Sequence, residues 1–402
     1  VHRIVQEVRH EGDRALFRYT ELLDRVELTP GNLMVSEEEF LSAERAADPE
    51  VVASLKKAAD NIFAFHEEQK PRSWMTYRAH GSILGQSVLP LSRVGIYVPG
   101  GTAAYPSSVL MNAIPALVAG VGEIIMSVPT KDGVINPHVL LAARFLGIRK
   151  IFKMGGAQAI AAMAYGTEYV PRVDKITGPG NIFVTLAKKE VYGHVDIDML
   201  AGPSEILILA DDSASPAYIA ADLLSQAEHD PLASSILITD NRSLAERAMN
   251  EVQNQLESLP RKDIAGVSIE KNGRIIVAEN MDQAIHLANI SGPEHVELLL
   301  RDPFHILPRI RCAGAVFIGE YSPEPLGDYF AGPNHVLPTG GTARFYSVLN
   351  VETFMRRTSI ISYTQKALED VSDDIIRLAE TEGLEAHARA IRMRRGENAE
   401  LS

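Results

Sequence analysis

Apolar positions in residues 1–23 follow the spacing of an amphipathic helix that is interrupted near Gly12. From about residue 90 the pattern changes to short apolar runs, each followed by a Gly-rich turn and a helical segment. These runs occupy residues 94–99, 123–129, 150–154, 173–177 and 204–210. They are rich in Val and Ile and apolar on both faces, which is typical of buried parallel strands. The alternation therefore predicts βαβ units and a mainly parallel sheet.

A second series of apolar runs covers residues 234–240, 274–279, 295–300 and 314–319, again separated by helical segments. The predicted fold is α/β, with two Rossmann-like parallel-sheet domains, an N-terminal helical region and a C-terminal helical tail. We expect residues 1–95 to form the helical part of a first domain, which residues 211–345 complete. Residues 96–210 would form the second domain, and residues 346–402 the tail.

Composition and charge narrow the class of protein. The 402 residues are 46% apolar and 23% charged, which is ordinary for a globular chain of two or three domains. The net charge of -13 repels phosphate backbones and argues against nucleic-acid binding as the main role. No run reaches about 18 apolar residues, so no membrane span is expected. The start of the chain lacks a secretory signal, and because it is not Met, we expect preceding residues.

The single cysteine, Cys312, lies in the apolar stretch RCAGAVFIG. One cysteine excludes an internal disulfide and any multi-Cys zinc site. We interpret it as a buried structural thiol, and the lack of disulfides fits a reducing compartment.

Glycine turns follow three of the predicted strands, at Gly100-Gly101, Gly155-Gly156 and Gly178-Pro179-Gly180. Open α/β sheets bind ligands where strands lead into helix N-termini, and glycine lets a ligand approach the backbone. No G-x-G-x-x-G motif follows these strands, so tight turns without a ligand are the stronger alternative. Polar side chains beside the turns could hydrogen-bond a ribose or an amide, namely Tyr97, Gln158 and Asn181.

The segment SPAYIAADLLSQAEHDP has helix-start and helix-stop signals at Ser215-Pro216 and Asp230-Pro231. Gln226 and His229 are three residues apart, so both emerge on one face near the end of this predicted helix. Such a pair can bind a metal in bidentate fashion, with neutral imidazole as the better ligand. On spacing alone, a helix end with satisfied polar groups remains the alternative.

Two loops carry further candidates. In SGPEHVELLL, Glu294 and His295 precede an apolar strand, and a carboxylate beside a histidine is a common general acid/base pair. Asp328 follows Gly327 in a loop rich in Gly and Pro, where a turn-stabilising role is the alternative. His335, in the same loop, is interpreted as structural.

Near the C-terminus, Glu382 and His387 lie in ETEGLEAHARAIRMR. On an unbroken helix they would be about 140° apart. They could therefore share a face only if the helix breaks at Gly383.

Long tracts of the sequence resemble histidinol dehydrogenase. They include VGIYVPGGTAAYPSSVLMNAIPA, GGAQAIAAMAYGTE, VDKITGPGN, IDMLAGPSEILILAD, DLLSQAEHDPLA, GPEHVEL, GDYFAGPNHVLPTGGTARF and EGLEAHA, in the order of that family. The resemblance implies a cytoplasmic zinc enzyme of histidine biosynthesis. Such an enzyme oxidises L-histidinol through L-histidinaldehyde to L-histidine and reduces two NAD.

The resemblance also implies roles for individual residues. Residues 96–210 become the NAD side, and residues 211–345 carry the zinc and catalytic residues. One zinc per subunit would be held by Gln226, His229, Asp328 and His387. The catalytic pair would be Glu294 and His295, and NAD would contact Tyr97, Gln158 and Asn181. The substrate, L-histidinol, would contact Ser204, Gln226, His229, Glu294, His295, Asp328, Glu382 and His387.

The family resemblance further implies a homodimer in which the C-terminal tail reaches into the active site of the partner, placing Glu382 and His387 there. We expect His295 to accept the alcohol proton and Glu294 to activate water for the aldehyde step. One departure, YSVLNVETFMRRTS after GTARF, carries none of these residues. Two alternatives remain: a dehydrogenase of another polar alcohol, and a non-catalytic α/β ligand-binding protein.

Overall fold

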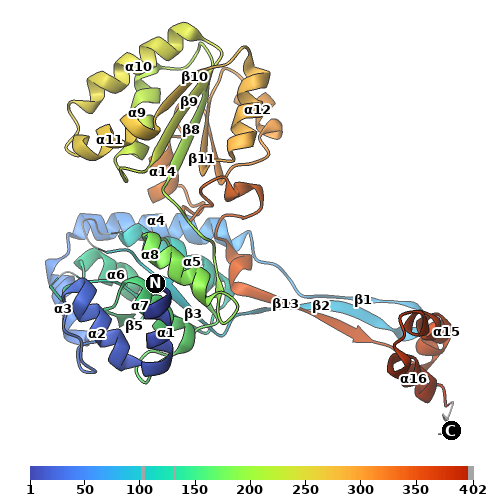
Figure 1. The fold of residues 1–402 in the computed structure, drawn as a ribbon. Helices are drawn as coiled ribbons and strands as arrows, with labels where there is room; N and C mark the ends of the chain where they lie inside the picture. Colours follow the sequence, from blue (N-terminus) through green and yellow to red (C-terminus); the bar gives the residue numbers. More distant parts are fainter. Residues whose placement is uncertain (101–104, 131, 397–402) are drawn as a thin grey trace. The chain divides into compact units, whose positions relative to one another are not determined.

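The computed structural model describes residues 1–100, 105–130 and 132–396 (Figure 1). The chain forms two compact units. Unit 1 comprises Val1–Lys70 and Leu91–Phe354, and unit 2 comprises Pro71–Pro90 and Met355–Ser402. None of the helices in the described ranges is long and apolar enough to cross a membrane.

Unit 1 contains two parallel sheets of five strands each. The first sheet has the order β5-β4-β3-β6-β7, so the chain starts in the middle, builds one side and then crosses to the other. Its strands are β3 (Arg93–Tyr97), β4 (Glu123–Ser127), β5 (Lys150–Phe152), β6 (Lys175–Thr177) and β7 (Asp196–Ile197). The helices between them are α5 (Pro106–Ala119), α6 (Pro137–Phe145), α7 (Gly156–Tyr165) and α8 (Ile182–Val191).

The second sheet repeats this topology, with the order β10-β9-β8-β11-β12. Its strands are β8 (Glu205–Ala210), β9 (Ser234–Thr239), β10 (Arg274–Val277), β11 (His295–Leu299) and β12 (Ala315–Ile318). One face is covered by α9 (Pro216–Ala227), α10 (Arg242–Leu256) and α11 (Lys262–Asn272), and the other by α12 (Met281–Ser291) (Figure 1). Two short helices lie before and after β12 in the chain, α13 (Pro303–Ile306) and α14 (Glu324–Tyr329). The prediction of two parallel-sheet α/β domains is confirmed.

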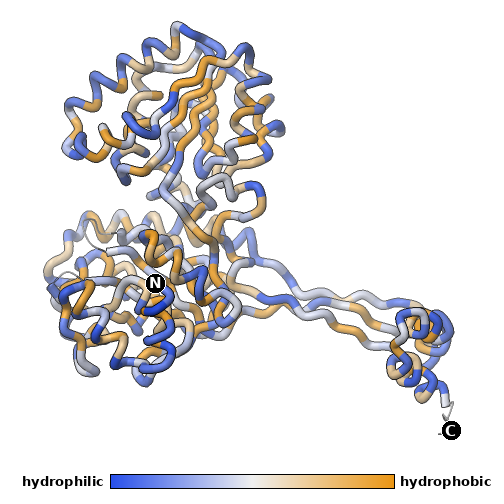
Figure 2. Tube along the Cα trace, in the orientation of Figure 1, coloured by the Kyte–Doolittle hydropathy of each residue, from blue (hydrophilic) through white to orange (hydrophobic). Residues whose placement is uncertain are grey.

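The apolar run at residues 204–210 was expected to close the first series of strands. It instead forms β8, the central strand of the second sheet. All its residues from Ile206 to Ala210 are buried, as befits a strand paired on both sides. Figure 2 shows the strands of this sheet as hydrophobic, whereas α10 carries hydrophilic residues on its outer side. An apolar run indicates a buried strand but carries no signal of which sheet it joins.

The N-terminal helices pack on the first sheet. We had expected residues 1–95 to form one domain with residues 211–345, which carry most of the second sheet, so this expectation was wrong. Helix α1 (His2–Glu11) and α2 (Asp13–Asp24) share a buried core with α7 and α8, and Gly12 separates them at a φ of 59°. Helix α3 (Glu37–Ala46) and α4 (Pro49–Glu67) contact α6 and α5. Helix α7 is rich in alanine and shares a buried core with α1 and α2, and small side chains allow helices to approach closely.

Unit 2 contains an antiparallel sheet in the order β1-β2-β13 and two helices. Its elements are β1 (Trp74–Tyr77), β2 (Ile83–Pro90), β13 (Met355–Ser362), α15 (Gln365–Thr381) and α16 (Glu385–Arg394). The helical tail was expected, but the strand before it was not. Residue Met355 pairs with Pro90 and Ser362 with Ile83, so the pairing joins segments more than 250 positions apart. Local periodicity does not show such a long-range pairing.

Leu16 tests the packing of the N-terminal helices. It is fully buried in the core shared with α7, whereas Leu22 on the same helix is 68% exposed. Leu16→Ala should lower the free energy of unfolding by about 2–5 kcal/mol, because it removes buried methyl groups and leaves a cavity. Leu22→Ala, the matched control, should change it by less than about 0.5 kcal/mol. Urea denaturation followed by circular dichroism measures both, and equal effects would contradict the described packing.

A second prediction concerns Glu297, a carboxyl buried on the central part of β11. Burial, together with the nearby Asp222, raises the pKa of Glu297 to about 9. The folded state therefore keeps a proton that the unfolded state loses near pH 4.5, and stability falls as the pH rises toward 9.

Glu297→Gln keeps a hydrogen-bond donor that does not titrate. The difference in unfolding free energy between pH 6 and pH 9 should shrink in this variant by more than about 1 kcal/mol, since one pKa unit corresponds to about 1.4 kcal/mol. Urea titrations at both pH values measure this difference. A wild-type protein that is equally stable at the two pH values would show that Glu297 does not titrate in this range.

Candidate metal and catalytic site

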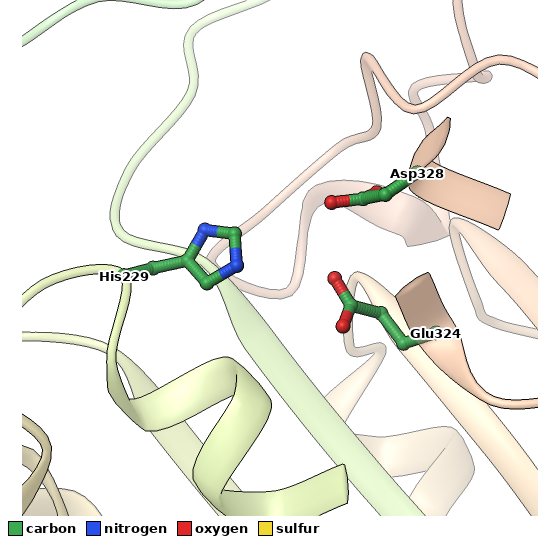
Figure 3. A group of neighbouring side chains, drawn as sticks. All are labelled: His229, Glu324 and Asp328. Carbon is green, nitrogen blue, oxygen red and sulfur yellow. The ribbon is translucent and has the colours of Figure 1, made fainter. Parts of the chain in front are cut away.

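A group of metal-ligating side chains gathers at one edge of the second sheet. His229 follows α9, and Glu324 and Asp328 lie one helical turn apart on α14. Figure 3 shows the three side chains pointing toward one another. One ligand atom from each lies within 4.8 Å of the others. Imidazole nitrogen and carboxylate oxygen are common ligands of zinc in proteins.

Helix α9 ends at Ala227, two residues before His229, so the helix is shorter than the sequence signals indicated. Gln226 still lies in its last turn and is fully buried. Neither its amide oxygen nor its amide nitrogen has a hydrogen-bond partner among the described residues. An unpaired buried amide costs free energy, so this side chain fits a site that binds a further group.

The carboxyl groups of the cluster have raised pKa values. Burial raises the pKa of Asp328 to about 6 and that of Glu324 to about 8, and repulsion between the two adds to the rise at Glu324. A cation would offset this repulsion, so the cluster fits a metal. Glu324 was not among the predicted ligands. Its position four residues before Asp328 could have indicated it, because residues i and i+4 share a helix face. Asp328 itself was expected in a loop and lies in α14.

Glu294 and His295 are both anchored to one residue at the start of β8. The backbone N–H of Glu205 donates to the Glu294 carboxylate at 2.9 Å, and Nδ1 of His295 lies 2.9 Å from the Glu205 carbonyl oxygen. A carbonyl only accepts, so Nδ1 of His295 donates and Nε2 carries the lone pair. Nε2 has no hydrogen-bond partner in the described part of the chain.

Burial sets the protonation of this pair. It lowers the pKa of His295 to about 4 and raises the pKa of Glu294 well above its ordinary value. His295 is therefore a neutral imidazole at pH 7, with an acceptor nitrogen free to take a proton. His295 can therefore serve as a general base, and Glu294 can accept a second proton when it is ionised.

Ser204 and His335 lie at the same edge of the sheet. Ser204 immediately precedes β8 and is half-buried, and its carbonyl accepts from the N–H of Ser234. Nδ1 of His335 lies 3.0 Å from the carbonyl oxygen of Asp328, and burial lowers the pKa of His335 to about 4. His335 lines a cavity of about 300 Å³ together with His295 and Asp328. The sequence reasoning treated it as structural and missed this placement.

A second cavity, of about 410 Å³, opens beside His229. Its walls also include Tyr105, Arg261 and Tyr329. Both cavities therefore border the cluster of candidate ligands, which gives a small polar molecule room to reach it.

The three expected cofactor residues lie at the carboxyl ends of the first sheet, on both sides of the point where its strand order reverses. Tyr97 ends β3, Gln158 lies in the first turn of α7, and Asn181 caps α8. The Asn181 side chain accepts from the N–H groups of Phe183 and Val184, so it also has a structural role. This edge is where α/β sheets of this topology bind ligands.

Glycine is required at the loop beside Tyr97. Gly178 has a φ of 112°, and a Cβ there would lie 2.1 Å from the Tyr97 carbonyl oxygen. Gly155 and Gly156 form the turn into α7 as expected, and Gly101 lies outside the described residues.

Glu382 and His387 belong to unit 2, where both are exposed. Helix α15 ends at Thr381 and α16 begins at Glu385, with Gly383 between them at a φ of 71°. The break at Gly383 is therefore present, and the participation of Glu382 and His387 in the site stays a prediction. Cys312, expected to be buried, is partly exposed.

Comparisons with known proteins agree with one family over nearly the whole chain. The family model described as histidinol dehydrogenase matches residues 1–395. Histidinol dehydrogenase of Halalkalibacterium halodurans is 57% identical over 395 residues, which cover 98% of this chain and 93% of the relative. That of Bacillus subtilis is 55% identical over 395 residues, covering 98% and 92%.

A solved structure agrees as well. The crystal structure of histidinol dehydrogenase from Elizabethkingia anophelis superposes with a TM-score of 0.94 at 39% identity, covering 98% of this chain and 90% of that one. The convergent ligand cluster, the anchored Glu294–His295 pair and these full-length similarities lead to one conclusion: the chain belongs to the histidinol dehydrogenase family of oxidoreductases.

Proposed function

We propose that the protein is a zinc-dependent enzyme that oxidises L-histidinol through L-histidinaldehyde to L-histidine and reduces two NAD. The observation that carries the proposal is the fully buried Gln226 amide, which has no hydrogen-bond partner within the described ranges and lies in the helix that ends beside the His229–Glu324–Asp328 cluster. Membership of the histidinol dehydrogenase family supports the substrate.

The proposed zinc ligands are Gln226, His229, Asp328 and His387. The first three lie in unit 1, and the C-terminal tail of a second subunit would supply His387 together with Glu382 for substrate binding. Glu324 is a further candidate ligand, because its carboxylate joins the same cluster. Bound zinc would hold the imidazole and amine of the substrate, and fixing a substrate in this way lowers the entropic part of the barrier.

The chemistry of the alcohol step requires a base for the hydroxyl proton, and we assign it to Nε2 of His295. This nitrogen is an acceptor because Nδ1 donates to the Glu205 carbonyl. Its lowered pKa keeps it unprotonated at neutral pH. Bound NAD would accept the hydride in each of the two oxidations.

The aldehyde step requires water, which adds to the carbonyl carbon to form a hydrate. We assign the activation of that water to Glu294, which lies beside His295 and accepts from the Glu205 N–H. A carboxylate whose pKa is raised by burial is a stronger base in its ionised form. The partly exposed Cys312 lies in the loop before β12, and this route needs no thiolate.

The cofactor side of the proposal assigns NAD contacts to Tyr97, Gln158 and Asn181. Two observations support these contacts. A side chain at Gly178 would collide with the backbone of Tyr97, and the buried amide oxygen of Gln158 is unpaired among the described residues. A cytoplasmic homodimer completes the proposal, since the family resemblance implies that the tail of a second copy supplies His387 and Glu382.

A dehydrogenase of another polar alcohol is the main alternative, and one assay separates it from the proposal. NADH formation at 340 nm is followed with L-histidinol as substrate, before and after removal of metal with a chelator. We expect turnover that falls at least about tenfold with the chelator and returns on adding zinc. Turnover with other alcohols alone would support the alternative. No turnover with any alcohol would favour a non-catalytic protein.

Variants of the catalytic pair test the division of roles. His295→Asn should reduce both oxidations by about 10²- to 10⁴-fold, the range expected for loss of a general base. Glu294→Gln should slow the oxidation of L-histidinaldehyde by a similar factor. His286→Asn, at an exposed histidine of α12, is the control and should leave both rates unchanged. Normal aldehyde oxidation by Glu294→Gln would exclude the water-activating role.

A further inference from the structure

The amide of Gln158 is held by a carboxylate from a distant part of the chain. Nε2 of Gln158 donates to Oδ2 of Asp24 at 3.1 Å. Gln158 lies in the first turn of α7 and is fully buried, whereas Asp24 is the last residue of α2 and is half-buried. This contact crosses 134 sequence positions and joins the N-terminal helices to the carboxyl edge of the first sheet.

The contact determines which way the amide faces. An ionised carboxylate can only accept hydrogen bonds, so the NH₂ group of Gln158 must be the end that faces Asp24. The amide oxygen Oε1 is then directed elsewhere. It is buried and has no hydrogen-bond partner among the residues that the structure describes.

Gly156 lies directly against Oε1. A Cβ on Gly156 would lie 2.8 Å from Oε1, closer than such atoms approach one another. Gly156 has a φ of 62°, which also favours glycine. The turn therefore places a buried, unpaired acceptor against a residue without a side chain, and such an acceptor is costly unless a donor arrives.

Tyr97 is a further polar residue at this turn. Its hydroxyl oxygen accepts from the N–H of Gly156 at 3.2 Å. Burial raises the pKa of Tyr97 to about 12, and the charge of Asp24 adds to the rise, so the hydroxyl stays protonated. Its O–H remains a donor toward a ligand, beside the Oε1 acceptor of Gln158.

We propose that Asp24 is a positioning residue for the nicotinamide cofactor, which orients the Gln158 amide so that Oε1 accepts from a donor on the cofactor. The donor would be a carboxamide N–H or a ribose hydroxyl, since both offer a hydrogen atom to an amide oxygen. The inference rests on the proposed function, in which this edge of the first sheet binds NAD. Asp24 acts through Gln158 and need not touch the cofactor itself.

Direct binding of NADH, followed by its fluorescence on titration into the zinc-loaded enzyme, tests the proposal. Asp24→Ala should raise the Kd for NADH about tenfold and the KM for NAD by a similar factor, with zinc content and the KM for L-histidinol unchanged. Asp24→Asn retains an acceptor oxygen and should recover most of the affinity. Gln158→Ala should weaken binding at least as much as Asp24→Ala.

A double-mutant cycle separates a positioning role from an independent contact. If Asp24 acts through Gln158, the Asp24→Ala/Gln158→Ala double variant should bind NADH no more weakly than Gln158→Ala alone. Additive losses would overturn the proposal.

Asp13 provides the matched control. It lies on the same helix α2 and ties that helix to the loop after α7, accepting from Thr167 Oγ1 at 2.6 Å and from the N–H of Glu168 at 2.9 Å. Asp13→Ala should loosen the helix without changing the Kd for NADH. An equal loss of affinity in Asp13→Ala and Asp24→Ala would overturn the proposal.

The outcomes also distinguish this inference from the proposed function. A wild-type enzyme that does not bind NADH would refute the assignment of NAD to this chain. A wild-type enzyme that binds NADH, with Asp24→Ala binding equally well, would refute only the role of Asp24.

Discussion

The arrangement of the second-sheet site depends on the pairing of β8 with β11. In this parallel register His295 lies opposite Ile206, which brings Glu205 beside the turn that carries Glu294. The backbone of Glu205 then donates to one catalytic candidate and accepts from the other. Because the contacts are made by backbone atoms, they survive a change of side chain at position 205. A slip of one residue in register would instead direct His295 to the other face of the sheet.

The same register explains the protonation states on which the chemistry rests. His295 is buried at the start of β11 and held through Nδ1, and Nε2 has no hydrogen-bond partner among the described residues. Burial pushes the histidine toward its neutral form and the nearby carboxyl groups toward theirs. A bound cation would stabilise the ionised forms of these buried acids. The electrostatics of the edge thus favour a metal independently of the resemblance.

Much of this could be predicted from the sequence. Short Val/Ile-rich runs showed most of the parallel strands, and the end of α9 indicated Gln226 and His229 as a possible pair. Asp328 and the Glu294–His295 pair also stood out from their sequence context, and the resemblance supplied the metal-ligand and catalytic roles expected of them. What the sequence could not provide was the assignment of elements to sheets. The pattern of residues 204–210 indicates a buried strand but not the sheet to which it belongs. The apolar faces of α1 and α2 likewise do not indicate which element they pack against.

The residues that were missed have a common physical reason. Glu324 shares a face of α14 with Asp328, but this segment was expected to be a loop, so helical spacing was not expected there. His335 takes its position from the loop after α14, whose conformation no local pattern shows. The strand β13 pairs with β2 across most of the chain, so no local pattern marks it.

The packing of the N-terminal helices on the first sheet, which was not expected, matters most for the proposed cofactor site. Had they packed on the second sheet, Asp24 would have had no access to the carboxyl edge of the first. Their packing on α7 brings a carboxylate to Gln158, which lies in the first turn of that helix. The alanine-rich helix α7 also begins at the Gly155-Gly156 turn. Helix α7 therefore takes part both in the core of the N-terminal region and in the proposed cofactor site, and Asp24 links the two through Gln158.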